Sequence, residues 1–300
     1  MTRMDLHGVF APIPTPFDRN EQLDEQRLKA ACARWAASPL SGIVVLGSTG
    51  EAVLLDEEES DRAVSIARDA WPPGRAFIVG TGRESTTATI EATRRAAALG
   101  ADAVLVRTPG FYKAQMNTDV FVRHYTAVAD ASPVPVLLYN FTAVTGVNLP
   151  PAAVSQLAAH SNIIGVKESG GDIAQISEFV KGSRAGFNVL AGSSTTFYSA
   201  LGVGAVGGIL ALACVLPDAC VRLFELTSAG NHDDAAALQM RLLPVAKLVG
   251  SMHGIAGLKA ALKLVGCEVG TTRSPLGPVS DATVAILREA LVSFEEVALV

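Results

Sequence analysis

Charged and aromatic side chains are scarce in this chain of 300 residues, at 18% and 6% of its composition. No cluster of lysines and arginines stands out, and the formal net charge is −5, so we expect no nucleic-acid partner. Hydrophobic residues reach 49%, which excludes a disordered chain and supports a large core.

Cysteine and histidine are also few. The cysteines form no C-x-x-C pair, which favours reduced core thiols in a cytoplasmic protein. They are Cys32, Cys214, Cys220 and Cys267. The five histidines are isolated, and no acidic pair has the spacing of metal ligands, so we predict neither a metal site nor a cofactor.

Long hydrophobic runs are missing as well. The first residues lack an apolar stretch of signal-peptide length. The apolar run over 201–216 is too short and too rich in glycine to span a bilayer. We therefore predict a soluble protein with no membrane partner.

What the sequence does contain is an alternation of short apolar runs and helical stretches. The interiors of the runs are almost wholly apolar, which is typical of parallel strands covered on both faces. The predicted strands are Gly8–Ile13, Gly42–Leu46, Ala76–Val79, Ala103–Val106, Val134–Tyr139, Ile163–Lys167, Val189–Ala191 and Gly204–Leu210.

Helix signals lie between these runs. Asp24 can cap one helix, Asp56 and Glu59 can form a capping box at the start of another, and Gly100 ends a helix over Thr86–Leu99. The repeated strand–helix units predict an α/β fold, a (β/α)8 TIM barrel. A doubly wound open sheet is the alternative.

After Leu216 the strand-like runs stop, and helical stretches follow over 217–229, 231–250, 254–266 and 280–297. The first of these would complete the barrel. We therefore predict a barrel of residues 1–229 and a helical C-terminal region of residues 230–300. No linker rich in Gly, Ser or Pro separates the two, so the second should pack on the first.

Lys167 is the most informative residue. It ends the apolar run Ile163–Lys167, and burying an ammonium at the end of a strand is unfavourable unless the group is used or paired. A desolvated lysine loses its proton more easily and can attack a ketone to form a Schiff base. The alternative is a lysine whose side chain reaches the surface at the end of its strand.

Other polar residues fall at the C-terminal ends of predicted strands, where the active sites of such barrels lie. The segment Gly47-Ser48-Thr49-Gly50-Glu51 predicts a tight turn whose N–H groups and hydroxyls converge on an anion, with a carboxylate as the expected guest. Tyr139 can move a proton to or from a reacting amine. Gly192 and Ser193 are small enough to leave room for a ligand. The alternative for the Gly47–Glu51 segment is a plain strand–helix turn, and the alternative for Tyr139 is an aromatic residue at the rim of the barrel.

The segment over 202–207 matches the G-x-G-x-x-G dinucleotide pattern literally. It follows a predicted helix over Thr195–Leu201 and leads into a strand-like run. The fingerprint should instead follow a strand and begin a helix, so the context argues against nucleotide binding.

Five motifs along the chain can be considered together: Pro14-Thr15-Pro16-Phe17, the Gly47–Glu51 segment, Thr108-Pro109, Leu138-Tyr139-Asn140 and Gly165-Val166-Lys167-Glu168-Ser169. With them, nearly the whole chain resembles the dihydrodipicolinate synthase/N-acetylneuraminate lyase family. The resemblance implies a barrel that is usually a homotetramer, a dimer of dimers. It also implies that Lys167 forms a Schiff base with pyruvate or another 2-oxo acid, that Tyr139 relays protons, and that Ser48 and Thr49 hold the carboxylate.

Within the family the likeness is greatest to 4-hydroxy-2-oxoglutarate aldolases, through segments such as Lys167–Asp172 and Gly254–Lys259. Two departures stand out. The tyrosine that a neighbouring subunit commonly lends to the relay is expected near Phe111, which has no hydroxyl, and Tyr112 is the candidate replacement. Val144 stands where dihydrodipicolinate synthases usually place an arginine for a second carboxylate.

We therefore predict a lyase that cleaves 4-hydroxy-2-oxoglutarate to pyruvate and glyoxylate, with Ser169 and Ser193 beside the distal half of the substrate. Arg107 and Lys113 are candidates to meet a second carboxylate. One alternative keeps the Schiff base but changes the reaction, to dihydrodipicolinate synthesis or to dehydration or aldol cleavage of a 2-oxo-3-deoxy sugar acid. Another is a non-catalytic relative that binds a small carboxylate.

Overall fold

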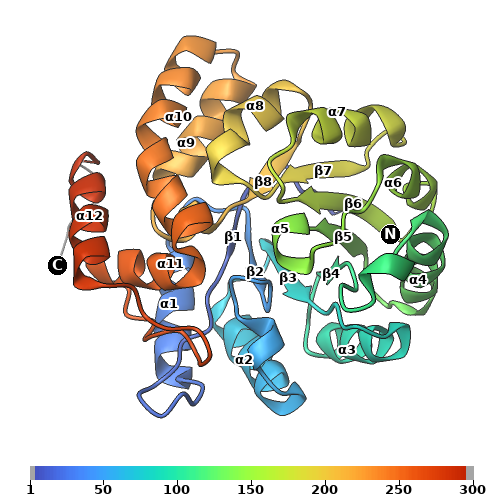
Figure 1. The fold of residues 1–300 in the computed structure, drawn as a ribbon, viewed down its shortest axis with the longest axis horizontal. Helices are drawn as coiled ribbons and strands as arrows, with labels where there is room; N and C mark the ends of the chain where they lie inside the picture. The colour runs from blue at the N-terminus through green and yellow to red at the C-terminus, as the bar shows by residue number, and fades with distance from the viewer. Residues whose placement is uncertain (1–3, 295–300) are drawn as a thin grey trace.

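The computed structural model describes residues 4–294 and confirms the (β/α)8 barrel (Figure 1). Eight parallel strands close in the order in which they occur in the chain, and β8 pairs with β1. The strands are β1 (Gly8–Pro12), β2 (Gly42–Val45), β3 (Ala76–Gly80), β4 (Ala103–Arg107), β5 (Val136–Asn140), β6 (Ile163–Glu168), β7 (Asn188–Ala191) and β8 (Gly207–Ile209).

Helices surround the strands, and the last ones gather beside β1 and α1 (Figure 1). They are α1 (Glu25–Ala36), α2 (Glu57–Ala70), α3 (Thr86–Ala98), α4 (Thr118–Ala131), α5 (Thr142–Thr145), α6 (Pro151–Leu157), α7 (Ile173–Gly182), α8 (Phe197–Gly202), α9 (Pro217–Ser228), α10 (His232–Lys247), α11 (Gly254–Leu264) and α12 (Asp281–Val292). None of the helices over residues 4–294 has both the length and the apolar character needed to cross a membrane.

The predicted helix signals act as expected. The Asp24 side chain accepts a hydrogen bond at the start of α1, and Asp56 and Glu59 form the capping box of α2. Gly100 follows α3 with a φ of 89°, a left-handed conformation that glycine adopts without strain. These caps fix the helices on either side of the segment that carries Ser48 and Thr49.

Two predicted strands are shorter than expected. The run over Gly204–Leu210 forms a strand only over Gly207–Ile209, because Gly204 has a φ of 106° and Ala205 N donates to Ala200 O to close α8. The run over Val134–Tyr139 begins at Val136, since Pro135 has no N–H for the sheet. The glycine-rich 202–207 segment therefore joins a helix to a strand, the reverse of a dinucleotide fingerprint.

Three helix predictions also differ from the structure. The stretch over Thr195–Leu201 is a 3₁₀ turn, Ser194–Thr196, followed by α8. The helix predicted over 231–250 ends at Lys247 and continues as a π-turn over Leu248–Met252. The last helix, predicted over 280–297, ends at Val292, and residues 295–297 lie outside the described residues.

The core has two layers. The larger lies between strands and helices, and all four cysteines are buried, as predicted. The other fills the barrel interior and consists of side chains that point inward from the strands. They include Phe10, Val44, Ile78, Leu105, Leu137, Tyr139, Leu190 and Ile209. Tyr139 is thus an interior residue of the barrel, at the C-terminal end of β5.

A buried lysine ties the region after α9 to the barrel. Lys259, on α11, is only 3% exposed, and its ammonium forms an ion pair with Glu51 at 2.7 Å. It also donates to the carbonyl oxygens of Thr15 and Thr271, each at 2.7 Å. Because the Thr15 hydroxyl donates to Gly50 O at 2.6 Å, a helix near the end of the chain fixes the turn after β2.

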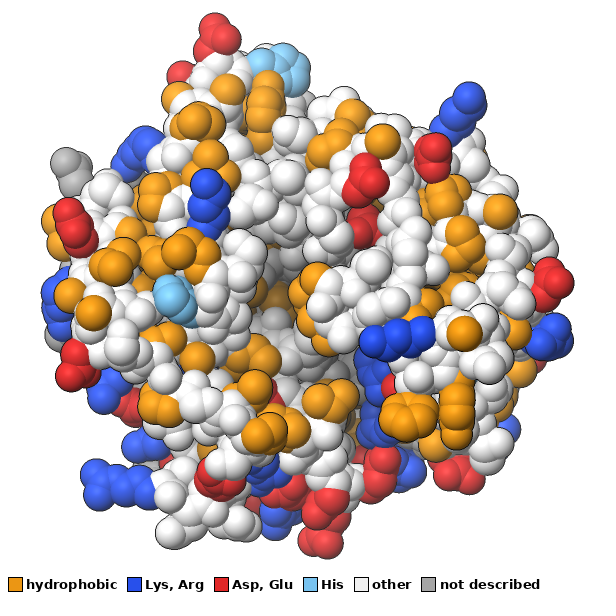
Figure 2. All heavy atoms as spheres, viewed as in Figure 1, with side chains coloured by type: hydrophobic (Ala, Val, Ile, Leu, Met, Phe, Trp, Pro, Cys, Tyr) orange, Lys and Arg blue, Asp and Glu red, His pale blue; other side chains and the backbone are white. Residues whose placement is uncertain are grey.

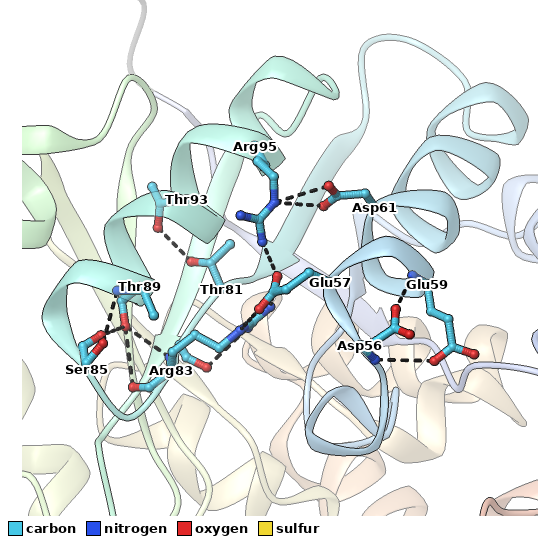
Figure 3. Close-up of polar contacts among 12 residues, drawn as sticks. Asp56, Glu57, Glu59, Asp61, Thr81, Arg83, Ser85, Thr89, Thr93 and Arg95 are labelled. Atoms are coloured by element: carbon cyan, nitrogen blue, oxygen red, sulfur yellow. Dashed lines mark hydrogen bonds and ion pairs between the residues drawn. The ribbon is translucent and has the colours of Figure 1, made fainter.

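Charged side chains join α2 to its neighbours. Figure 3 shows Glu57 of α2 between Arg83 and Arg95, with Arg95 also reaching Asp61 at 3.1 Å. The two arginines hold the pKa of the Glu57 carboxyl below its usual range, chiefly through the hydrogen bond from Arg83. The α2–α3 wall of the barrel is thereby cross-linked close to the strand ends.

We expect Glu51→Gln to lower the free energy of unfolding by about 3–5 kcal/mol, because it leaves the Lys259 charge buried without its counter-charge. Urea denaturation measures the loss. The matched control is Glu268→Gln, which removes an exposed ion pair with Lys263 and should cost no more than about 1 kcal/mol. Equal losses in the two variants would contradict the tie described above.

Stability should also depend on pH through His124, which is 6% exposed and whose Nε2 has no hydrogen-bond partner. Burial lowers the pKa of His124 to about 4. An unfolded histidine titrates near about 6.5, so the unfolded chain takes up this proton first as the pH falls. The free energy of unfolding is therefore unaffected by His124 above about pH 6.5. It falls by up to about 3 kcal/mol as the pH is lowered from there toward pH 4.

Unfolding of the wild type and of His124→Leu, measured from pH 7 to pH 4, tests this dependence. The variant should show a flatter pH profile. His232→Leu, at an exposed position, should keep the wild-type profile. A His124→Leu profile as steep as that of the wild type would assign the pH dependence to other groups.

Candidate active site

Lys167 and Tyr139 face each other at the C-terminal end of the barrel. They are register partners on β6 and β5, and the Lys167 ammonium lies 4.3 Å from the centre of the Tyr139 ring. Both side chains are 3% exposed. Gly165 lets β6 fit between its neighbours, since a Cβ there would lie 2.3 Å from Asn188 O on β7 and 2.9 Å from Leu137 Cδ2 on β5. The predicted burial of the lysine at its strand end is confirmed.

The turn after β2 reaches the same point from the other side. The hydroxyls of Ser48 and Tyr139 are 2.9 Å apart. Gly50 N and Glu51 N donate to Gly47 O and Ser48 O, so these two N–H groups are used inside the turn. An anion would therefore be met by the side chains and remaining N–H groups of Ser48 and Thr49.

The backbone of this turn is strained at both ends. Leu46 and Glu51 adopt left-handed φ values of 56° and 55°, which cost about 1–2 kcal/mol each in residues other than glycine. Gly80 makes room for the first, since a Cβ at Gly80 would lie 1.9 Å from Leu46 O. The ion pair with Lys259 holds the second. The strain is located where the turn presents its hydroxyls.

These groups line one cavity of about 760 Å³, at the hollow in the centre of Figure 2. It brings together most of the residues selected from the sequence: Ser48, Thr49, Tyr139, Lys167, Ser169, Gly192 and Ser193. Its lining contains no aspartate or glutamate, so the cavity suits an anionic ligand.

Gly192 is small for a reason that the structure makes clear. A Cβ at this position would lie 1.9 Å from Ser169 Oγ, so the two strand ends approach only because the side chain is missing. The neighbouring Ser193 hydroxyl lies 2.9 Å from that of Thr195. Hydroxyl groups therefore form the side of the cavity that faces away from Ser48.

Tyr112 is the exception among the predicted residues. Its side chain is 68% exposed and packs edge-on against Phe111. It lines neither the Lys167 cavity nor the cavity that adjoins it. Phe111, 75% exposed, lines an adjoining cavity of about 960 Å³ that shares Ser48, Tyr139 and Val144 with the first. Within one chain, then, the Tyr112 hydroxyl does not join the Lys167 cavity.

Arg107 and Lys113 line that adjoining cavity and not the one around Lys167. The Arg107 guanidinium forms an ion pair with Glu84 at 2.7 Å, and Glu84 also accepts from the N–H groups of Gly110 and Phe111. The Arg107 charge is thus used to hold the loop after β4.

Sequence reasoning missed Glu168, which is 1% exposed. Its carboxylate accepts from Asn140 Nδ2 at 2.6 Å, Gln175 Nε2 at 2.8 Å and Gly170 N at 2.5 Å. Burial raises the pKa of Glu168 above its usual range, while these donors oppose the rise. The carboxylate fastens the loop that carries Ser169 to β5 and α7.

The sequence did contain a signal for this network. Glu168 directly follows Lys167, and Asn140 directly follows Tyr139, on neighbouring strands. Since successive strand residues point to opposite faces, one pair enters the barrel and the other meets outside it. The same register therefore places Lys167 beside Tyr139 inside the barrel and Glu168 beside Asn140 outside it.

The arrangement can carry out amine chemistry. A lysine amine in an apolar cavity can attack a ketone. A phenol whose ring lies beside the amine, and whose hydroxyl lies 2.9 Å from a serine hydroxyl, is placed to pass protons. The Ser48–Thr49 turn opposite the lysine can hold a carboxylate attached to that ketone. Nothing in this scheme draws on a metal or an organic cofactor.

The chain is similar to known proteins over nearly its whole length. The model of the Dihydrodipicolinate synthetase family matches residues 5–293. A 4-hydroxy-tetrahydrodipicolinate synthase of Exiguobacterium sp. is 37% identical over 97% of this chain and 98% of its own length. A protein of Emericella nidulans, named a probable mitochondrial 4-hydroxy-2-oxoglutarate aldolase, is 36% identical over 94% of this chain and 93% of its own.

The fold agrees equally well with solved structures. The chloride-inhibited dihydrodipicolinate synthase of Acinetobacter baumannii, complexed with pyruvate, has a TM-score of 0.91 at 28% identity. The match covers 96% of this chain and 98% of that one.

We expect Glu168→Gln to destabilise the fold by about 1–3 kcal/mol, because an amide turns one acceptor into a donor that faces other buried donors. Urea denaturation of the purified variant measures this. Glu178→Gln, at an exposed position on α7, the helix that carries Gln175, should change stability by less than about 0.5 kcal/mol. A Glu168→Gln protein as stable as this control would show that the carboxylate does not hold the loop.

Proposed function

Because the chain belongs to the dihydrodipicolinate synthetase family, and is therefore a lyase of the class I aldolase type, we propose that it cleaves 4-hydroxy-2-oxoglutarate to pyruvate and glyoxylate. The observation that carries the proposal is the buried Lys167 amine, 4.3 Å from the centre of the Tyr139 ring, whose hydroxyl lies 2.9 Å from that of Ser48. Amine, phenol and carboxylate-binding turn lie together in one cavity.

The reaction follows from these roles. The Lys167 amine attacks the C2 ketone, and loss of water from the carbinolamine gives an imine. Removal of the proton from the C4 hydroxyl breaks the C3–C4 bond, glyoxylate leaves, and the protonated imine takes up the electron pair as an enamine. Protonation at C3 and hydrolysis then release pyruvate and the free lysine. Tyr139 moves the protons, and Ser48 and Thr49 hold the C1 carboxylate.

The nature of residue 144 supports the aldolase reaction over dihydrodipicolinate synthesis. Val144 is 62% exposed and lines both cavities, so the position faces the substrate path with an apolar side chain. The likeness to the Emericella nidulans protein points the same way. Synthesis of dihydrodipicolinate is the second candidate, favoured by the Exiguobacterium relative.

We also propose that the active form is a homotetramer, a dimer of dimers, in which a second copy covers the exposed Phe111 and Tyr112. Exposed aromatic neighbours beside a cavity are typical of an interface between chains. In such a dimer the Tyr112 hydroxyl of one copy would approach the relay of the other, which is the catalytic role predicted for it from the sequence.

Borohydride reduction with pyruvate, followed by intact-mass analysis and peptide mapping, tests the Schiff base. We expect a pyruvate-derived adduct on Lys167 in the wild type and none in Lys167→Ala. A product assay with 4-hydroxy-2-oxoglutarate, with pyruvate plus aspartate semialdehyde, and with a 2-oxo-3-deoxy sugar acid then identifies the reaction. An adduct combined with turnover of only one of the latter substrates would replace the aldolase assignment.

The same assay separates the relay from binding. Tyr139→Phe keeps the ring over Lys167 and removes only the hydroxyl. It should lower kcat by about 10²–10⁴-fold, the usual contribution of a proton-transfer group, with a much smaller change in KM. A change confined to KM would remove Tyr139 from the relay.

A further inference from the structure

An unusual piece of backbone forms part of the wall of the Lys167 cavity. Between α10 and α11 the chain forms the π-turn Leu248–Met252, and Gly254 follows with a φ of 52°. Turns of this kind are rare and occur frequently at functional sites. Residues 249–251 and His253 all line the Lys167 cavity, so the turn directs the segment toward the reacting lysine.

His253 differs from everything around it. Among the described residues that line this cavity, Lys167 and His253 alone have a basic nitrogen in the side chain. The other polar groups there are hydroxyls. Within residues 4–294 the His253 imidazole has no hydrogen bond or ion pair to another side chain, so its N–H is available to a ligand.

The proposed binding mode leaves the far half of the substrate free to reach other residues of the cavity. If the Ser48–Thr49 turn holds C1 and Lys167 holds C2, the remaining carbons extend away from β2. Ser169 and Ser193, at the ends of β6 and β7, and residues 249–251 and 253 line the same cavity.

We propose that His253 is the specificity-determining residue of this enzyme and donates a hydrogen bond to the distal carboxylate of its substrate. Ser169 and Ser193 complete the subsite. The inference rests on the proposed aldolase function and adds to it the residue that recognises the carboxylate of the aldehyde half.

The competing cations lie elsewhere. Lys113 is part of the adjoining cavity, across Val144, and its ammonium lies over Gly146, where an added Cβ would be 2.6 Å from Nζ. Arg107 is held by Glu84. A distal carboxylate in the Lys167 cavity therefore meets His253 and the hydroxyls first.

The test runs the reaction as a condensation of pyruvate with either of two aldehydes. Glyoxylate carries the carboxylate, and glycolaldehyde has a hydroxymethyl group in its place. The wild type should prefer glyoxylate. His253→Leu should lower kcat/KM for glyoxylate by about 10- to 100-fold, the range for a hydrogen bond to a charged group, and change glycolaldehyde by less than about threefold. His253→Gln, which keeps an N–H donor, should recover part of the loss.

Two further variants complete the design. His232→Leu, exposed at the start of α10, should behave as the wild type. Lys113→Met should leave the preference for glyoxylate intact. Borohydride trapping with pyruvate should give the same adduct on Lys167 in His253→Leu as in the wild type, which shows that the fold and the amine are preserved.

The outcomes that overturn the proposal are separate from failure of the function itself. Equal losses with both aldehydes, no loss with either, or loss of the preference in Lys113→Met in place of His253→Leu each overturn the role of His253. A wild type that forms the pyruvate adduct but condenses no glyoxylate overturns the aldolase function, and the His253 role with it.

Discussion

The ion pair between Glu51 and Lys259 is the contact on which the rest of the site depends. Both groups are almost fully removed from water, so removal of either one would leave the other as an unpaired buried charge and strongly destabilise the fold. Glu51 ends a turn whose backbone is strained, and Lys259 also grips the carbonyl of Thr15, whose hydroxyl holds the same turn. The position of the Ser48 hydroxyl is thereby set by a helix that contributes nothing to the barrel sheet.

Register is the second constraint. Parallel pairing of β5 with β6 puts Tyr139 opposite Lys167 and Asn140 opposite Glu168. The first pair faces the cavity and the second forms a buried hydrogen-bond network. A shift of one residue would exchange the two, with the carboxylate inside and the amine outside. A side chain at Gly165 would collide with Asn188 O on β7 and Leu137 on β5, so glycine lets β6 fit between its two neighbours.

Much of this arrangement could be predicted from sequence. Strands that are apolar throughout, caps such as Asp56 and Glu59, and a lysine at the end of a buried run identify the barrel and its reactive end. The family resemblance supplied the roles of Ser48, Thr49 and Tyr139. The family is confirmed, while those roles remain predictions.

Other features could not be found in this way, because they arise from contacts between distant segments. The π-turn at Leu248–Met252 reads as the end of an ordinary amphipathic helix, and only packing against the barrel brings His253 to the cavity. Lys259 looks like one lysine among several. The exposure of Tyr112 depends on how the loop after β4 is held by Glu84. The predicted starts of two strands were wrong, because Gly204 adopts a left-handed conformation and Pro135 has no N–H to donate to the sheet.

The tie between Glu51 and the end of the chain has a consequence for synthesis on the ribosome. The backbone N–H of Arg273, which also donates to the Glu51 carboxylate, comes 222 residues later in the sequence. While β1 to β8 emerge, the carboxylate of Glu51 has no cation to receive it, and its left-handed turn has nothing to hold it. The sheet can pair before these residues are made, but the turn that carries Ser48 and Thr49 is held in its final shape only after Lys259 and Arg273 have been synthesised.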